Sequence, residues 1–344
     1  MNTLPITCVW EITSKQENNH NLSYSKKKIS EELTTQEALN FINMCADLGV
    51  FWINFSGEKL LCRNDIFTLI EHCEKNNIFS NIITNANEID KEKAELLKKY
   101  NVSTIAISIN KLNDEQKKEK SDFFLIKNAF EILKKFNINT VAITMVTNNN
   151  IGYLEKIKKL LISLSVSSWQ LQIGLLKEED SSDQLISPEQ VETIMDFCYE
   201  TTSEKKIHVY PADCIGYYSS KEDKIRKKAF EEDDFSFEGC AAGIKSFGLL
   251  SNGDVVGCIS LRDKSFVEGN IREKTLREIW ESPKAFLWRR SLLSENFEGV
   301  CKNSRNSEKK CINKCINTHL AVDVYCGNQY CAHSLSANLH DQKT

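Results

Sequence analysis

The chain has 344 residues, of which 41% are hydrophobic and 27% are charged, which suffices for one large core or two ordinary domains. Its 44 lysines and arginines are offset by 48 aspartates and glutamates, and the net charge of −4 argues against broad binding to nucleic acid or to an anionic membrane. The sequence contains no apolar run long enough for a membrane span and no signal-peptide pattern near Met1, so we expect a globular, cytoplasmic protein.

The first 201 residues alternate short β-branched or aromatic runs with longer amphipathic segments. This alternation is typical of successive βα units, in which parallel strands are covered by helices. A serine followed by proline at Ser187 and Pro188 predicts the start of a further helix. The predicted strands are 6–13, 51–55, 79–84, 102–109, 139–146 and 168–173, and the clearest helices are 35–48, 65–76 and 123–136.

Six βα units are compatible with either a doubly wound sheet or an incomplete barrel, and periodicity alone does not distinguish them. After residue 201 the pattern loosens, and residues 221–234 (KEDKIRKKAFEEDD) are dense in charge. We interpret this stretch as an exposed linker or surface helix that marks a boundary and not a binding site.

The thirteen cysteines are unevenly distributed, because seven of them lie between Cys240 and Cys331. Without a secretion signal they are not expected to form a disulfide framework, and metal ligation is the first hypothesis for the C-terminal group. Cys214 follows a predicted seventh strand end and could face a barrel mouth. The others are expected to be small buried hydrophobic residues, namely Cys8, Cys45, Cys62, Cys73 and Cys198.

Residues 10–24 (WEITSKQENNHNLSY) resemble the opening of radical SAM proteins, in which a strand ending in threonine leads into a CxxxCxxC loop. In the register set by Thr13 and Tyr24, the three cysteine positions fall on Gln16, His20 and Ser23. The resemblance implies a site for a [4Fe-4S] cluster that binds S-adenosylmethionine (SAM), but an amide and a hydroxyl are poor replacements for thiolate ligands. We therefore expect this SAM site to be degenerate.

A second segment, residues 53–66 (INFSGEKLLCRNDI), resembles the family's GGE motif, which helps to bind the SAM amino group. With Arg63 in register, Gly57, Glu58 and Lys59 take the three positions, whereas a one-residue deletion would leave Glu58 as the acid. Residues 82–86 and 106–110 resemble the ends of the third and fourth strands. Polar residues at the strand ends, Glu11, Glu58, Lys59, Asn85 and Asn110, would line a barrel mouth.

The C-terminal segment resembles the SPASM iron-sulfur module. Cys240, Gly253 and Cys258 follow its C-x(9 to 15)-G-x4-C spacing, and Asn252-Gly253 also predicts a β-hairpin turn. The second half departs from the pattern, because Ser304 replaces one cysteine. The resemblance implies one or two auxiliary [4Fe-4S] clusters, with Cys240, Cys258 and Cys315 binding the first, and Cys301, Cys311 and one or both of Cys326 and Cys331 binding the second.

Zinc is the alternative metal, because sites with four cysteines, or with three cysteines and a histidine, use similar spacings and His319 and His333 lie nearby. For fold and domains, the resemblance implies a degenerate radical SAM partial barrel of the incomplete (βα)6 type over 1–205 and a linker or bridging region over 206–239. A SPASM auxiliary-cluster domain over 240–333 and a tail over 334–344 complete the predicted organisation.

For function, the resemblance implies a radical-SAM-like iron-sulfur protein without catalytic residues, because the SAM cluster and SAM itself are expected to be absent. It would act as an accessory in the maturation of a ribosomally made peptide or protein. Its partners would be a peptide substrate, a catalytic radical SAM enzyme or both, and electrons could pass through its auxiliary clusters. The alternative is an active radical SAM/SPASM peptide-modifying enzyme with unconventional cluster ligation.

Overall fold

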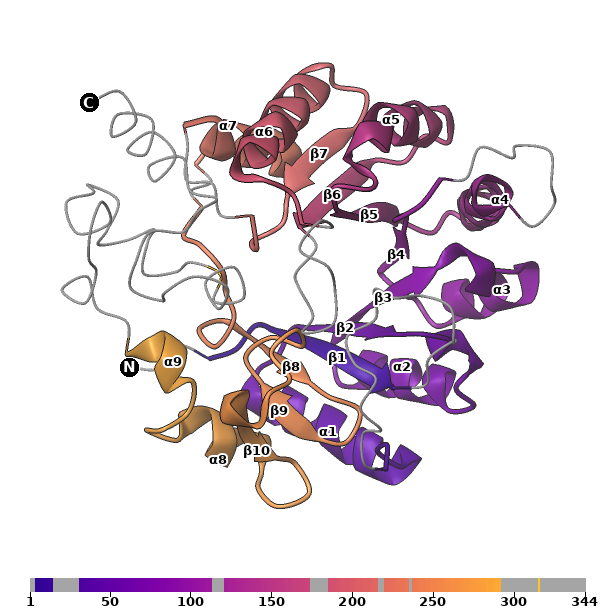
Figure 1. The fold of residues 1–344 in the computed structure, drawn as a ribbon. Helices are drawn as coiled ribbons and strands as arrows, with labels where there is room; N and C mark the ends of the chain where they lie inside the picture. The colour runs from indigo at the N-terminus through magenta and orange to yellow at the C-terminus, as the bar shows by residue number, and fades with distance from the viewer. Residues whose placement is uncertain are drawn as a thin grey trace, which may run out of the picture. The chain divides into compact units, whose positions relative to one another are not determined.

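The computed structural model describes residues 4–14, 31–112, 121–173, 185–215, 220–234, 237–291 and Cys315 (Figure 1). The chain divides into two compact units, each assembled from segments that are distant in the sequence. No helix in these ranges has the length and apolar character needed to cross a membrane. Unit 1 comprises 1–108, 114–140 and 241–291, and unit 2 comprises 109–113, 141–240 and 292–344.

Unit 1 contains strands in the order β10-β9-β8-β1-β2-β3-β4. Strands β8, β1, β2, β3 and β4 run parallel, whereas β9 and β10 are antiparallel additions, and Figure 1 shows the orange β8 beside the indigo β1. The elements are β1 (Thr7–Thr13), α1 (Thr35–Leu48), β2 (Trp52–Gly57), η1 (Leu60–Cys62), α2 (Ile66–Lys75), β3 (Phe79–Asn85), η2 (Ala86–Glu88), α3 (Lys91–Lys99), β4 (Thr104–Ser108), α4 (Asp122–Lys135), β8 (Ser246–Leu249), β9 (Asp254–Val256), η5 (Lys264–Phe266), β10 (Val267–Asn270), α8 (Leu276–Glu281) and α9 (Leu287–Arg290).

Unit 2 contains the parallel strands β5, β6 and β7. Its helices continue the βα alternation, and the helix predicted at Ser187 begins there, with the Ser187 hydroxyl capping the amide of Gln190. The elements are β5 (Thr140–Val146), η3 (Ile151–Tyr153), α5 (Leu154–Ser163), β6 (Ser168–Ile173), α6 (Pro188–Ser203), β7 (His208–Pro211) and α7 (Ser220–Phe230). The predicted α/β fold with parallel strands and all six predicted strands are confirmed.

Helices α1 to α5 end in the same way, with a residue in the left-handed backbone region followed by a buried valine or isoleucine. The amide of that apolar residue donates to the helix carbonyl five residues earlier, as Ile78 does to Cys73 at 2.9 Å. This Schellman-type ending fixes where each following strand begins. The left-handed residues are Gly49, Asn77, Asn101, Asn137 and Ser165, and the apolar residues are Val50, Ile78, Val102, Ile138 and Val166.

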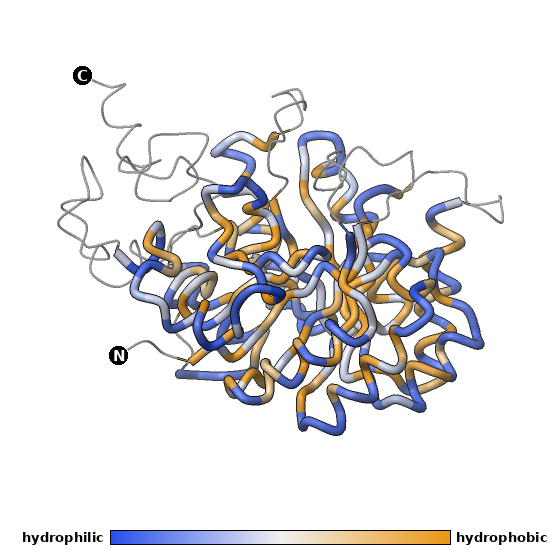
Figure 2. The backbone as a smooth tube through the Cα atoms, turned by 90° about the horizontal axis from the view of Figure 1, so that it is seen from below, coloured by the Kyte–Doolittle hydropathy of each residue, from blue (hydrophilic) through white to orange (hydrophobic). Residues whose placement is uncertain are grey.

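The core of unit 1 includes three of the cysteines predicted to be buried. Cys8, Cys45 and Cys73 have no exposed surface, and burial raises the pKa of the Cys73 thiol to about 12. In Figure 2 the tube of the helices alternates between hydrophobic and hydrophilic residues, as expected for helices that cover a sheet. Cys198 in unit 2 is also buried, but the prediction for Cys62 was wrong, because η1 leaves its side chain exposed.

The charged stretch 221–234 forms most of helix α7, and its prediction as an exposed segment was wrong for three residues, Glu222, Ile225 and Arg226. Glu222 and Arg226 are buried and form an ion pair of 3.0 Å, and the Arg226 guanidinium lies 3.8 Å from the centre of the Phe237 ring. Helix α7 packs against α6 and β7. This part of the chain is therefore integral to the core of unit 2, whereas the predicted domain boundaries stay a prediction.

Candidate functional site

The ends of β1 and β2 meet at Thr13 and Gly57, which are paired in the sheet. Gly57 has a φ angle of 142°, and a Cβ atom there would lie 3.0 Å from the Cγ2 and O atoms of Thr13. Only glycine allows both this backbone conformation and this close approach. Gly57 thus has a packing role at the same position where the sequence resembles a SAM-binding motif.

Glu32 joins the two segments that flank residues 15–30, an interval outside the described residues. Its Oε1 atom accepts hydrogen bonds from the Thr13 hydroxyl at 2.9 Å, the Ser14 amide at 2.8 Å and the Ser14 hydroxyl at 3.3 Å. Hydrogen bonds to an ionised acceptor are stronger than neutral ones. A single carboxylate therefore joins the two segments that flank the interval containing Gln16, His20 and Ser23.

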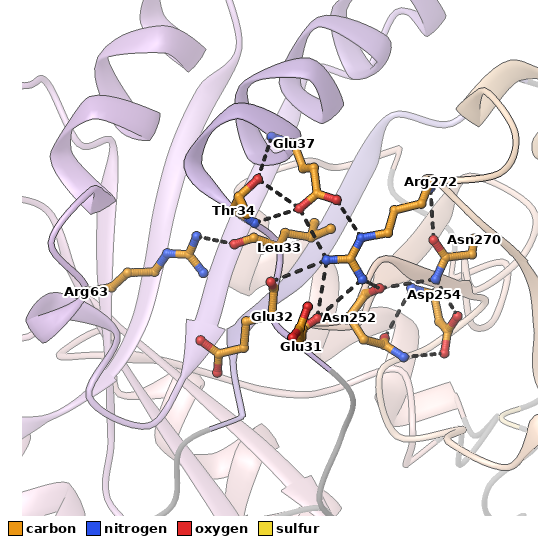
Figure 3. A network of polar contacts seen from close by, with 10 residues as sticks. All are labelled: Glu31, Glu32, Leu33, Thr34, Glu37, Arg63, Asn252, Asp254, Asn270 and Arg272. Carbon is orange, nitrogen blue, oxygen red and sulfur yellow. Dashed lines mark hydrogen bonds and ion pairs between the residues drawn. The ribbon is translucent and has the colours of Figure 1, made fainter.

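Arg272, which lies between β10 and α8, binds the residues that directly follow this interval (Figure 3). Its guanidinium donates to the carbonyl oxygens of Glu31 and Glu32 at 3.3 Å and of Asn252 at 3.1 Å. It also pairs with the Glu37 carboxylate, with 2.5 Å between Nε and Oε1. The C-terminal hairpin is thereby tied to the segment that enters α1.

Arg63 holds the same segment from the opposite side (Figure 3). It donates to the carbonyl of Leu33 at 2.7 Å and to the carbonyl of Ile12 on β1 at 2.9 Å. Asp65 orients the guanidinium through an ion pair of 2.6 Å. Arg63 thus connects the ends of β1 and of the 15–30 interval to the turn that follows β2.

The Arg272–Glu37 pair predicts a dependence of stability on pH. The hydrogen bond from Arg272, together with those from Thr34, lowers the pKa of Glu37 to about 2. Because the pKa of Glu37 is lower in the folded protein than in the unfolded chain, the pair contributes its full stability above about pH 4.5. This contribution is lost as the pH falls toward 2. We expect Arg272→Gln to lower the free energy of unfolding by about 1 kcal/mol near neutral pH, and the difference from wild type to shrink between pH 5 and pH 3.

The measurement is thermal unfolding of wild type and Arg272→Gln across that pH range. Arg277→Gln is the matched control, because Arg277 lies on α8, pairs with Glu281 at 2.8 Å and donates to the Asp47 carbonyl. If the difference in stability between wild type and Arg272→Gln stays constant down to pH 3, the role assigned to Glu37 is contradicted.

Glu88 shapes the turn after β2, and sequence reasoning missed it. Its buried carboxylate accepts from the amides of Lys59 at 3.2 Å and Leu61 at 3.1 Å and from the Thr84 hydroxyl at 2.7 Å. Lys59 itself has a left-handed φ of 55°. The backbone amides of Lys59 and Leu61, close to Glu58, are therefore hydrogen-bonded within the protein.

Glu11 and Arg262 form a largely buried ion pair inside unit 1. One bond joins Oε1 of Glu11 on β1 to Nη1 of Arg262 at 2.9 Å, and a second joins the other carboxylate oxygen to Nη2. Arg262 lies four residues after Cys258, whose carbonyl accepts from the Leu261 amide at 2.9 Å. The pair links the segment of a predicted metal ligand to the strand that leads into the 15–30 interval.

The predicted strand-end residues differ in their roles. The side chain of Asn110 in unit 2 accepts from the Met145 amide at 2.9 Å, so it joins two backbone segments. Glu58 and Lys59 lie in the turn after β2, with Glu58 partly exposed. Gln16, His20 and Ser23 lie outside the described residues.

The predicted metal ligands are described only in part. Cys240 and Cys258 are partly exposed, and Cys315 is buried. The nine cysteines in the described ranges form no disulfide with one another, which leaves thiol donors suited to iron or zinc. Within those ranges no three potential ligands gather. Cys301, Cys311, Cys326 and Cys331 fall outside the described residues.

The backbone before Cys258 is covered by an aromatic side chain. A Cβ atom on Gly257 would lie 2.3 Å from the Trp288 indole, so only glycine fits beneath the ring. The indole nitrogen of Trp288 donates to Glu268 at 2.9 Å. The hairpin predicted at Asn252-Gly253 is confirmed, because β8 and β9 pair antiparallel around it. This packing holds the Cys258 segment against α9.

Comparisons with known proteins agree with this architecture. Residues 15–161 match the Radical SAM superfamily, and residues 240–316 match the iron-sulfur cluster-binding SPASM domain. The AdoMet-dependent heme synthase of Methanosarcina barkeri is 26% identical over 88% of this chain and 88% of its own. The PqqA peptide cyclase of Granulibacter bethesdensis is 32% identical over 24% of this chain and 22% of its own.

The fold is also similar to a solved structure of Streptococcus suis SuiB bound to the precursor peptide SuiA. The TM-score is 0.72 and the identity 16%, over 94% of this chain and 75% of that one. The chain therefore has the radical SAM α/β fold with a parallel-strand sheet and contains a SPASM iron-sulfur cluster-binding domain, and its homologues include peptide maturases.

Proposed function

We propose that the chain is a non-catalytic radical-SAM-like iron-sulfur protein that assists the maturation of a ribosomally made peptide. It would bind the peptide, a catalytic radical SAM enzyme or both. Named homologues that act on peptides, such as the PqqA peptide cyclase, support peptide binding. We assign the protein to the cytoplasm, where thirteen cysteines stay reduced.

One observation carries the proposal: residues 14–34, which join β1 to α1, contain no cysteine. Oxygen and amide donors do not suit an iron-sulfur cube, so the residues present do not fit the SAM cluster. The base of this interval is instead held by Glu32, Arg63 and Arg272 through hydrogen bonds that need no metal.

The C-terminal cysteines fit an auxiliary cluster by their donor chemistry. Cys240, Cys258 and Cys315 would hold a first cluster, and Cys301, Cys311 and one or both of the last two cysteines a second. A bound [4Fe-4S] cluster supplies one-electron transfer. The protein's own contribution would be to hold the Cys258 segment through Trp288 and through the Glu11–Arg262 pair.

The second candidate is an active radical SAM/SPASM enzyme with unconventional ligands. The observation that favours it is the long match to AdoMet-dependent heme synthases, which extends over 88% of this chain. In that case His20 would be the ligand with precedent in iron-sulfur proteins.

The test is anaerobic reconstitution followed by iron and sulfide analysis, reduction and incubation with SAM. Wild type is expected to bind iron and sulfide only at the auxiliary sites and to form no 5′-deoxyadenosine. The matched variant Gln16→Cys/His20→Cys/Ser23→Cys restores the three thiolates. It is expected to gain about four irons per chain, as for one [4Fe-4S] cluster.

The opposite result has a clear signature. Formation of 5′-deoxyadenosine by wild type, lost in His20→Ala, would reject the accessory role and establish the enzyme. Zinc without sulfide in the reconstituted protein would instead reject the iron-sulfur assignment of the C-terminal cysteines.

A further inference from the structure

Unit 1 carries an exposed apolar patch where its strands begin, at the opposite end from the candidate site. We call Ile6, Phe51, Trp52 and Phe79 the strand-start patch. Phe51 is 47% exposed and Phe79 is 44% exposed. Among the described residues, eight large hydrophobic side chains are exposed, and three of them, Ile6, Phe51 and Phe79, belong to this patch.

The patch is ordered by backbone and ring contacts. The Phe51 amide donates to the Ile6 carbonyl at 2.8 Å, and the Phe79 amide donates to the Phe51 carbonyl at 3.0 Å. The rings of Phe51, Trp52 and Phe79 contact one another pairwise, with centroids between 4.8 and 5.3 Å apart. Because the rings support each other, a partner would lose little side-chain entropy on binding here.

Lysines gather at the same end of the unit. Helices α2, α3 and α4 end where the strands start, and their last turns carry Lys75, Lys98, Lys99 and Lys135. The amine of Lys98 reaches the Asn137 carbonyl at 3.5 Å. These lysines also complement the helix dipoles, so their charge alone defines no site. The ring cluster at the same end of the unit is the second feature, and an aromatic centre with a polar rim is typical of interfaces.

We propose that the strand-start patch binds a short acidic segment with aromatic or large aliphatic side chains from another protein. Carboxylates of the segment would pair with the lysines, and its apolar side chains would cover Phe51, Trp52 and Phe79. An anionic membrane is disfavoured, because the chain as a whole has a net charge of −4. A short segment experiences only the charges close to it, since charges are screened beyond about 8 Å. The surface is independent of the proposed function and applies equally to an active enzyme.

The test uses a short synthetic peptide in which glutamates alternate with phenylalanine and leucine. Binding of the peptide is measured by calorimetry. We expect saturable micromolar binding that weakens about tenfold in Phe51→Ser/Phe79→Ser and in Lys98→Glu/Lys99→Glu. The matched controls are Phe124→Ser and Lys156→Glu/Lys159→Glu, which lie elsewhere and should bind as wild type; Phe124 and Lys159 are exposed, and Lys156 is partly exposed. Circular dichroism checks that each variant folds.

Three outcomes would overturn the proposal. The first is no saturable binding of the peptide to the wild-type chain. The second is equal binding by the patch variants and the controls, or by a peptide with lysine in place of glutamate. The third is that wild type binds phosphatidylserine vesicles and not the peptide, and that the patch variants lose this vesicle binding. The surface would then be a membrane site.

Discussion

Replacing Arg226 by alanine is expected to lower the local free energy of unfolding of unit 2 by about 3–5 kcal/mol, the usual cost of breaking a buried ion pair. The Arg226 and Glu222 side chains are only 3% and 1% exposed, so the substitution takes the cation away from a buried carboxylate. It also removes the guanidinium that stacks on Phe237, three residues before Cys240. Hydrogen exchange of peptides from α7 and β7 should accelerate by a hundredfold or more, because each 1.4 kcal/mol is about tenfold.

The double variant Glu222→Leu/Arg226→Met is the control for this prediction. It removes both charges and keeps the apolar volume, and such replacements are often neutral in stability. We therefore expect its exchange rates to stay much closer to those of wild type. Equal losses in the single and double variants would mean that packing of Arg226, and not its charge, stabilises α7.

Replacing Glu11 by alanine is expected to cost unit 1 about 3 kcal/mol by the same principle. The carboxylate makes two bonds to Arg262, and both side chains are mostly buried. Because Arg262 lies four residues after Cys258, the substitution should also loosen the Cys258 segment. We expect faster hydrogen exchange in β1 and in residues 257–263, together with faster loss of bound metal to a chelator.

Two further variants test whether the loss comes from breaking the ion pair. Glu11→Gln keeps one acceptor for Arg262 and should lose less stability than Glu11→Ala. Glu11→Leu/Arg262→Leu removes the pair altogether and should recover most of the loss. If all three variants release metal at the wild-type rate, the pair does not support the Cys258 segment.

Much of the fold could be predicted because its signals are local. Each strand and helix of the βα repeats shows its own periodicity, and endings such as Asn77-Ile78 and Asn137-Ile138 are readable as a left-handed residue before a buried one. The burial within α7 was missed because it depends on partners outside the helix. Charge density suggested exposure, whereas Arg226 is enclosed by α7 and Phe237.

Less of the candidate site could be predicted, because its contacts join residues that are distant in the sequence. Arg262 reaches Glu11 across 251 positions, and Arg272 reaches Glu37 across 235. No periodicity or motif spacing reports such pairs. The capping box of Thr34 and Glu37 was a readable signal, but only the structure shows that Glu37 also binds Arg272. The motif at Gly57 pointed to the right turn without revealing Glu88.

The contact between Glu32 and the Thr13–Ser14 pair has a consequence for how this protein can change. Since the residues on either side of the interval are already joined, lengthening the connection between them should cost little closure entropy, about 0.6 kcal/mol for each doubling of a loop. Substitutions or insertions there would be tolerated without unfolding the sheet. The interval therefore offers engineers a permissive place to graft foreign sequences.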